Sequence, residues 1–439
     1  MDSISVQEEF FTDVVLHNDK IRSELPPKVK ISRGNDILFH VFFFLMGVCH
    51  FIAMTFFSAA NNFWLHKFRN LDDDTNSAEN RTFLQQNFGS ASMIANTIPV
   101  LALGIFNIVY GNKFKIINRI MLTFGIELVI FIFFTISTQV DTDDYQVAFF
   151  CSVMLFYAVI SGAVTVNMVA SMNLYTRFPH KYMKTAFIGE GCSGIVGSVL
   201  NVISIAIFNG QLIPATLMYF ICGSLVVGAT FVMTIIVSRN STFRACIESV
   251  TESKKIPTMS QLKEALWKIR FAAYMMALTF LGTSATHTSV TSLVVSEVDS
   301  GTSSWAKNYF SPVMTFLLTD IALLFGRIVS SFLPLNIPDY VLLILATLRT
   351  LTVVPAIWFC NAQPRNHLPI LFKHDYQYGI IITVSMFLMG YFLNTSFLHI
   401  ATTIKDPNEA DIAFTVFGLC VNTLQTITSP IGIFIVNIL

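Results

Sequence analysis

The sequence predicts an all-α polytopic membrane protein with about eleven transmembrane helices. Hydrophobic residues make up 54% of the 439-residue chain and charged residues only 12%, against about 25% charged residues in a soluble domain. Apolar runs of about 20 residues, long enough to cross the hydrocarbon core as a helix, recur along the whole chain. They lie near residues 37–60, 86–110, 116–139, 147–172, 185–208, 213–238, 271–296, 308–334, 338–360, 376–400 and 411–438.

The longest polar interruption separates six of these spans from the remaining five. We therefore expect a cytoplasmic N-terminal segment at 1–36, a six-helix bundle at 37–238, a cytoplasmic linker at 239–270 and a five-helix bundle at 271–439. Residues 1–36 lack the basic and apolar regions of a cleaved signal peptide, so the first apolar run should remain in the protein as a helix.

The distribution of Lys and Arg predicts the orientation in the membrane. With the N-terminus inside, the cytoplasmic segments hold 18 basic residues and the opposite side holds 6. The positive-inside rule then places the N-terminus in the cytoplasm and the C-terminus outside the cell. The sequon Asn80-Arg81-Thr82 falls in the external loop 61–85, which predicts glycosylation at Asn80. No acidic dileucine sorting signal stands near the N-terminus, which favours the plasma membrane over an endosomal one.

The chain carries no pattern of enzyme chemistry. It has no HExxH, GxSxG or Walker-type motif and no carboxylates paired at a working spacing, so we expect neither catalysis, a cofactor nor a metal site. The run Gly189-x-Gly191-x-x-Gly194 matches a dinucleotide fingerprint, but it follows no strand and begins a hydrophobic helix. Close helix packing explains these small residues better. A net charge of zero argues against a nucleic-acid partner.

Two charged residues in one apolar run are the leading functional candidates. Asp320 and Arg327 are seven residues apart, about two helical turns, so they share a stripe of one helix. An arginine at bilayer depth costs roughly 2.5–3.5 kcal/mol on insertion scales, so its side chain should face protein or a water-filled cavity. Such a residue marks either a substrate pathway or a structural lock between helices.

Other spans carry polar stripes whose neighbours the sequence does not identify. In the first span, His50, Met54, Ser58 and Asn61 recur at helical spacing and either line a cavity or pack against other helices. Asn167 needs a hydrogen-bonding partner within the hydrocarbon. Four further ionisable residues fall within the spans. Glu127 has no evident partner, and Glu190 is either part of a gating salt bridge or an interfacial charge. His287 stands in a Ser/Thr-rich segment, and Arg349 is within reach of either Asp320 or carbonyl groups.

Several short motifs in order resemble the equilibrative nucleoside transporter family over about 250 residues. They are Gly189-Glu190-Gly191-x-x-Gly194, Ser304-Trp305…Tyr309-Phe310-x-Pro312, Phe325-Gly326-Arg327-x-x-Ser330, Pro355…Cys360-Asn361…Pro364-Arg365, Phe372-x-His374-Asp375, Gly390-Tyr391 and Lys405-x-Pro407-x-Glu409-Ala410. The resemblance implies a major-facilitator-like transporter bundle in a six-plus-five arrangement that works by alternating access. It also implies facilitative transport of nucleosides by a protein embedded in the bilayer, which we expect to be a monomer.

The resemblance also implies roles for individual residues. Arg327 matches the family's arginine that hydrogen-bonds the ribose, and Asp320 would accept hydrogen bonds from the same sugar. The expected base pocket consists of Met54, Ser58, Asn167 and Met168, with His50 nearby on the first span. The usual acid four residues before the arginine is Leu323, and Met168 stands where the family has a glutamine.

These departures leave other functions open. They imply a divergent member of the family with an altered substrate choice, and a carrier of nucleobases or organic cations is the first alternative. A non-transporting membrane receptor or scaffold is the second alternative. Proton coupling through His50, Glu127 or His287 is a further option.

Overall fold

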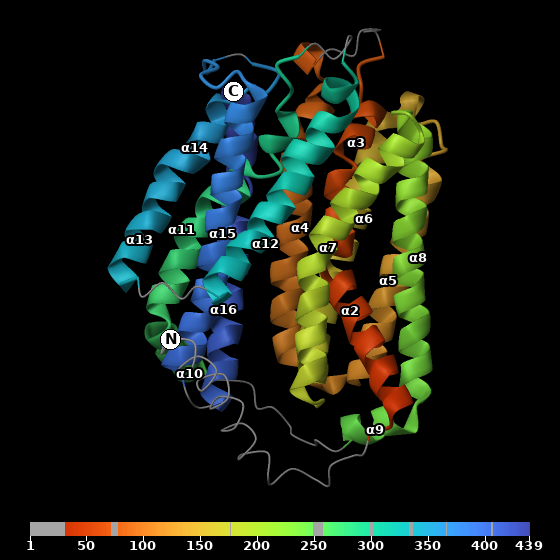
Figure 1. The fold of residues 1–439 in the computed structure, drawn as a ribbon, viewed down its shortest axis with the longest axis vertical. Helices are drawn as coiled ribbons and strands as arrows, with labels where there is room; N and C mark the ends of the chain where they lie inside the picture. The colour runs from red at the N-terminus through yellow and green to blue at the C-terminus, as the bar shows by residue number, and fades with distance from the viewer. Residues whose placement is uncertain are drawn as a thin grey trace.

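The computed structural model describes residues 31–71, 78–175, 177–248, 258–298, 303–332, 337–365, 367–404 and 407–439. Two groups of helices stand side by side in an elongated bundle (Figure 1). Ten helical segments among the described residues are long and apolar enough to cross a membrane. Together with α11 (Arg270–Thr286), which has 17 residues, they account for the expected eleven spans.

The first group, the N-half, contains the long helices that precede the linker. Its elements are α2 (Arg33–Ala59), α3 (Asn61–Lys67), α4 (Phe83–Tyr110), α5 (Ile116–Ser137), α6 (Gln146–Tyr175), α7 (His180–Ile207) and α8 (Leu212–Arg239), with short 3-10 turns at Ala78–Asn80, Gly111–Lys113 and Asp143–Tyr145. Its core is rich in phenylalanine, with stacked rings such as Phe57 on Tyr157 and Phe56 on Tyr219. Aromatic burial of this kind gives the half a single contiguous core.

The second group, the C-half, follows the linker and is less regular. Its elements are α11, α12 (Leu318–Phe332), α13 (Asp339–Leu348), α14 (Val354–Ala356), α15 (Asp375–Thr403), α16 (Pro407–Thr428) and α17 (Ile431–Ile438), with π-helical turns at Trp305–Tyr309, Ser311–Leu317 and Arg349–Val353 and 3-10 turns at Thr291–Leu293 and Ile357–Phe359. Pro312 and Pro355 stand at or just after these π-helical turns, where a missing backbone N–H is tolerated.

Two short helices form within the expected linker. They are α9 (Ser241–Glu248) and α10 (Met259–Lys268), and residues 249–257 between them lie outside the described part of the chain. Lys268 of α10 pairs with Glu409 of α16, which ties the linker to the C-half. We call the end of the bundle that holds α9 and α10 the linker end. The opposite end holds α3, the Ala78–Asn80 turn and the C-terminal residue Leu439, and we call it the loop end (Figure 1).

Within each half, one pair of parallel helices approaches closely through glycine. A Cβ atom on Gly47 of α2 would lie 2.0 Å from the carbonyl oxygen of Ala186 in α7, and Gly189 of α7 meets the α2 backbone in the same way. Gly326 and Gly390 do the same between α12 and α15. Backbones can pack this closely only where side chains are absent, so Gly189 of the discarded nucleotide motif is a helix-packing residue.

One expected span is wrong in its second half. The run 271–296 was expected to be one helix, but α11 ends at Thr286 and the next two residues turn away. Thr288 adopts a left-handed backbone with φ of 69°, and its N–H donates to the Thr291 hydroxyl (3.1 Å). Ser and Thr hydroxyls compete with helical hydrogen bonds, and this segment is rich in both. The helix therefore stops beside the centre of the bundle.

Candidate functional site

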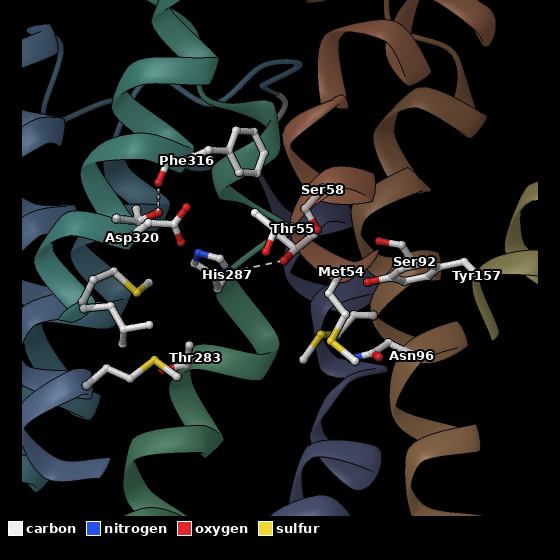
Figure 2. Close-up of a pocket in the computed structure, with 16 residues that line it drawn as sticks. Met54, Thr55, Ser58, Ser92, Asn96, Tyr157, Thr283, His287, Phe316 and Asp320 are labelled. Atoms are coloured by element: carbon white, nitrogen blue, oxygen red, sulfur yellow. Dashed lines mark hydrogen bonds between the residues drawn. The ribbon is translucent and has the colours of Figure 1, made fainter. Parts of the chain in front are cut away.

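A cavity of about 240 Å³ lies between the two halves near the middle of the bundle (Figure 2). Helices α2, α4 and α6 form one wall, and α11, α12 and α15 form the other. The lining residues are Met54, Thr55, Ser58, Ser92, Met93, Asn96 and Tyr157 from the N-half and Thr283, His287, Thr288, Phe316, Thr319, Asp320, Leu323, Met386 and Met389 from the C-half. Both halves thus contribute to one site.

Asp320 supplies the carboxylate of this cavity. Its Oδ2 accepts a hydrogen bond from the hydroxyl of Ser198 in α7 (2.6 Å), which fixes the side chain across the junction of the two halves. Gly194, one turn earlier in α7, leaves room for the carboxylate, because a Cβ there would lie 2.8 Å from Oδ1. Figure 2 shows Asp320 and His287 projecting into the same cavity. The site can accept hydrogen bonds from a polar ligand or attract a cation.

Besides its hydroxyl and amide groups, the wall carries soft apolar side chains. Met54 and Met93 line it from the N-half, and Met386 and Met389 line it from the C-half. Methionine adapts its shape and makes favourable contacts with aromatic rings. At about 240 Å³, the cavity is smaller than the roughly 300–1,000 Å³ of pockets for drug-sized ligands, so a ligand held in it must be small.

Three predicted site residues lie together in this cavity, and four lie outside its wall. Met54, Ser58 and Asp320 are lining residues, whereas Arg327, His50, Asn167 and Met168 are not. Asn167 is fully buried inside the N-half, where it faces Glu127 of α5. Met168, the next residue of α6, is half-buried.

Arg327 belongs to a second polar cluster, two turns of α12 nearer the linker end. Glu190 of α7 interacts electrostatically with its guanidinium, and the same carboxylate contacts His50 Nδ1 of α2 at 2.6 Å. Arg327 Nε and His50 Nε2 are buried and have no hydrogen-bonding partner among the described residues. The ion pair of this cluster, His50–Glu190, lies within the N-half, and the longer-range interaction of Glu190 with Arg327 links α7 to α12 of the C-half.

The other intramembrane arginine is held within the C-half. Arg349 donates from Nε to the Ser385 carbonyl (2.9 Å) and from Nη1 to the Thr279 carbonyl (3.1 Å). Its Nη2 donates to the hydroxyls of Thr283 (2.8 Å) and Ser385 (3.3 Å). Of the two environments that the sequence left open, the structure has the carbonyl cage and not a pair with Asp320.

Contacts between the halves are numerous at the loop end. Arg81 donates to the carbonyls of Leu293 (3.0 Å) and Gln363 (2.6 Å), and Asn61 donates to the Ser292 carbonyl (3.2 Å). Burial lowers the pKa of Arg81 to about 10, so its guanidinium stays charged at neutral pH. These bonds hold the two halves together at the loop end.

Several lining residues were not predicted, although part of their signal was in the sequence. Ser92 and Asn96 of α4, like Thr283 and His287 of the seventh span, are four residues apart and therefore share one helix face. Such a polar face indicates a wet or packed surface but not which helix stands opposite. Tyr157, Met386 and Met389 carry no such signal, because aromatic and thioether side chains are equally common in lipid-facing and buried positions.

Comparison with known proteins gives consistent matches over most of the chain. A profile described as "Nucleoside transporter" matches residues 152–424. Equilibrative nucleoside transporter 3 of Rattus norvegicus is 23% identical over 385 residues, which covers 81% of this chain and 80% of that protein. Equilibrative nucleoside transporter 1 of Homo sapiens is 23% identical over 373 residues, covering 77% and 80%.

One solved structure matches the architecture. It is a bacterial homologue of the human lysosomal transporter Spinster, described as inward-facing and unoccupied, with a TM-score of 0.54. The match covers 91% of this chain and 82% of that one at 12% identity, so the likeness concerns the fold alone. The all-helical, major-facilitator-like bundle expected from the sequence is confirmed.

Proposed function

The chain belongs to the equilibrative nucleoside transporter family, and on that premise we propose that its central cavity carries nucleosides across the membrane down their gradient. The observation that carries the proposal is a cavity walled by both halves, with one carboxylate among hydroxyls and four methionines. A nucleoside presents a hydroxylated sugar and a flat base, which match these two kinds of wall. The chain is a transporter rather than an enzyme.

Asp320 is the proposed sugar-binding group. Its carboxylate is anchored by Ser198 through Oδ2 and is free to accept hydrogen bonds from sugar hydroxyls through Oδ1. Ser58, on the opposite wall, can donate or accept a further hydrogen bond. Met54 and the other methionines would then pack against the base, where sulfur–aromatic contacts contribute about 0.3–1.5 kcal/mol each.

Arg327 is proposed to contact the sugar from the linker side of the cavity. It stands four residues beyond the lining residue Leu323, so both lie on one face of α12. Its side chain is half-buried, so we propose that the accessible part of the guanidinium donates to a passing hydroxyl, although Nε itself is buried. His50, Asn167 and Met168 stand behind the wall, and we propose that they shape it through the packing of α2 and α6.

The transport cycle is proposed to alternate between two closures of the same cavity. With the N-terminus and linker in the cytoplasm and the C-terminus outside, closure at the loop end makes this conformation inward-facing. Both walls come from one chain, so a monomer suffices for transport. The lack of an endosomal sorting signal supports the plasma membrane, and the exposed Asn80, at the loop end, would be its glycosylation site.

The test is uptake of radiolabelled uridine and adenosine into proteoliposomes. Asp320→Asn keeps the shape of the side chain and removes its charge, and we expect it to lower uptake at least tenfold, since a hydrogen bond to a charged group contributes about 1.5–3 kcal/mol. Arg327→Ala should abolish uptake while leaving membrane insertion intact. Asp144→Asn is the matched control, because Asp144 is exposed in a loop and should not affect uptake.

Competition experiments separate this function from its rivals. The unpaired carboxylate in the cavity favours an organic cation as the second candidate, so uridine uptake should be tested against adenine and against a monoamine. Three results together would establish a cation carrier: the monoamine alone inhibits, Asp320→Asn loses uptake, and Arg327→Ala does not lose it. A purified protein that binds and moves none of these solutes would instead be a receptor or scaffold.

A further inference from the structure

Glu127 is buried in the middle of the N-half, away from the central cavity. It lies on α5, which packs against α6 and α8, and its side chain has no exposed surface. Neither carboxylate oxygen has a hydrogen-bonding partner among the described residues. Asn167 of α6 faces it, but the Asn167 Nδ2 group also remains without a partner.

No cation among the described residues compensates this acid. The helices packed around Glu127 present an amide from α6, the Thr230 hydroxyl from α8 and the thiol of Cys49 from α2, which donates to Thr230 (3.2 Å). Within the described ranges, no lysine, arginine or histidine acts on Glu127 electrostatically. An isolated carboxylate in such surroundings would cost many kcal/mol, so the group exists there as the neutral acid.

A stripe of polar side chains runs from Glu127 towards the interface of the two halves. Asn167, Ser171 and Tyr175 follow one another at intervals of four residues along α6, so they share a face. The Ser171 hydroxyl donates to Asn167 Oδ1 (3.3 Å). All three are buried, and Tyr175 lies beside His50, with ring centroids 6.4 Å apart.

The stripe ends at the cluster that joins the halves. Tyr175 interacts electrostatically with Glu190, which contacts His50 and also acts on Arg327 of the C-half. Unpartnered buried atoms recur along the whole line, at Glu127, Asn167, Tyr175, His50 and Arg327. Native proteins leave few such atoms, and a row of them indicates a functional path.

We propose that Glu127 is a proton-binding site, connected by this stripe to the His50–Glu190–Arg327 cluster, so that proton binding and the alternation of the halves are coupled. Binding converts the carboxylate and one proton from solution into the neutral acid, and release reverses this step. The conformation closed at the loop end holds the proton, so low pH favours it by linkage. The coupling rests on the proposed transport function, whereas the proton site does not.

Infrared difference spectroscopy on the purified full chain tests the proton site directly. The wild type should show the carbonyl stretch of a protonated, buried carboxyl group at neutral pH, and Glu127→Gln should remove that band. Glu297→Gln is the matched control, because Glu297 is an exposed acid paired with His374 and should leave the band unchanged. A band that persists in Glu127→Gln overturns the proposal, whether or not the protein transports nucleosides.

Uptake into proteoliposomes tests the coupling. Wild-type uridine uptake should change severalfold between acidic and neutral pH, whereas Glu127→Gln, which mimics the neutral acid, should transport with a much flatter pH profile. Tyr175→Phe keeps the ring and removes only the hydroxyl, and it should shift the profile without abolishing uptake. A flat wild-type profile, or a Glu127→Gln profile equal to that of the wild type, contradicts the coupling.

Discussion

Glu127 and Arg349 occupy comparable places in the two halves but have opposite surroundings. Each stands near the middle of the third membrane-spanning segment of its half, and each is almost completely buried. Arg349 makes four hydrogen bonds, to two carbonyls and two hydroxyls. Glu127 makes none. On the proposal above, ionisable groups at bilayer depth have two uses: a satisfied group holds helices together, and an unsatisfied one is available for proton exchange.

The surroundings of the two residues explain this difference. Arg349 begins the π-helical turn Arg349–Val353 and reaches backbone oxygens of α11 and α15, so one side chain ties together three elements of the C-half. The guanidinium has five donors in a fixed plane and can satisfy several acceptors at once. A carboxylate only accepts hydrogen bonds, and the helices around Glu127 offer few donors that are not already used within the helices themselves.

Arg349→Leu should produce the largest effect on stability. It leaves the acceptors of Ser385, Thr279 and Thr283 without their donor in a dry interior, and we expect a loss on the order of 3 kcal/mol. Thermal unfolding in detergent should show a much lower melting temperature and little folded protein after purification. Arg270→Leu, at an exposed position of the same half, should change the melting temperature little. Equal behaviour of the two variants would contradict the structural role of Arg349.

Arg349→Lys should produce an intermediate loss of stability. The ammonium keeps the positive charge but has three donors for four acceptors and lacks the planar geometry, so a cost of about 1–2 kcal/mol is expected. The same unfolding measurement should place this variant between the wild type and Arg349→Leu. A melting temperature as low as that of Arg349→Leu would show that shape, rather than charge, holds the cage together.

The two residues also show how far the sequence could predict this molecule. Apolar runs defined the spans because the bilayer imposes one length on every helix, and only the seventh span failed, where Thr288 leaves the helix. Asp320, Met54 and Ser58 line the central cavity, whereas His50 and Asn61, which share a predicted stripe with Met54 and Ser58, do not. Helical spacing gives the polar face of a helix but not what that face meets. The partners of Glu127 and Arg349 could not be predicted, since spacing along one helix says nothing about which neighbour covers that face.

Glu127→Gln should produce the smallest change in stability, and the direction of that change shows whether the acid is neutral or charged. If the acid is neutral in the folded protein, the amide replaces it with nearly the same shape and charge, and stability at neutral pH should change by less than about 1 kcal/mol. If the acid were ionised, removing an unpaired buried charge would raise stability by several kcal/mol, on the order of 3 to 5. A melting temperature close to that of the wild type therefore supports a bound proton. A strong increase would mean that Glu127 is charged and unpaired in the folded protein, and it would rule out the bound proton.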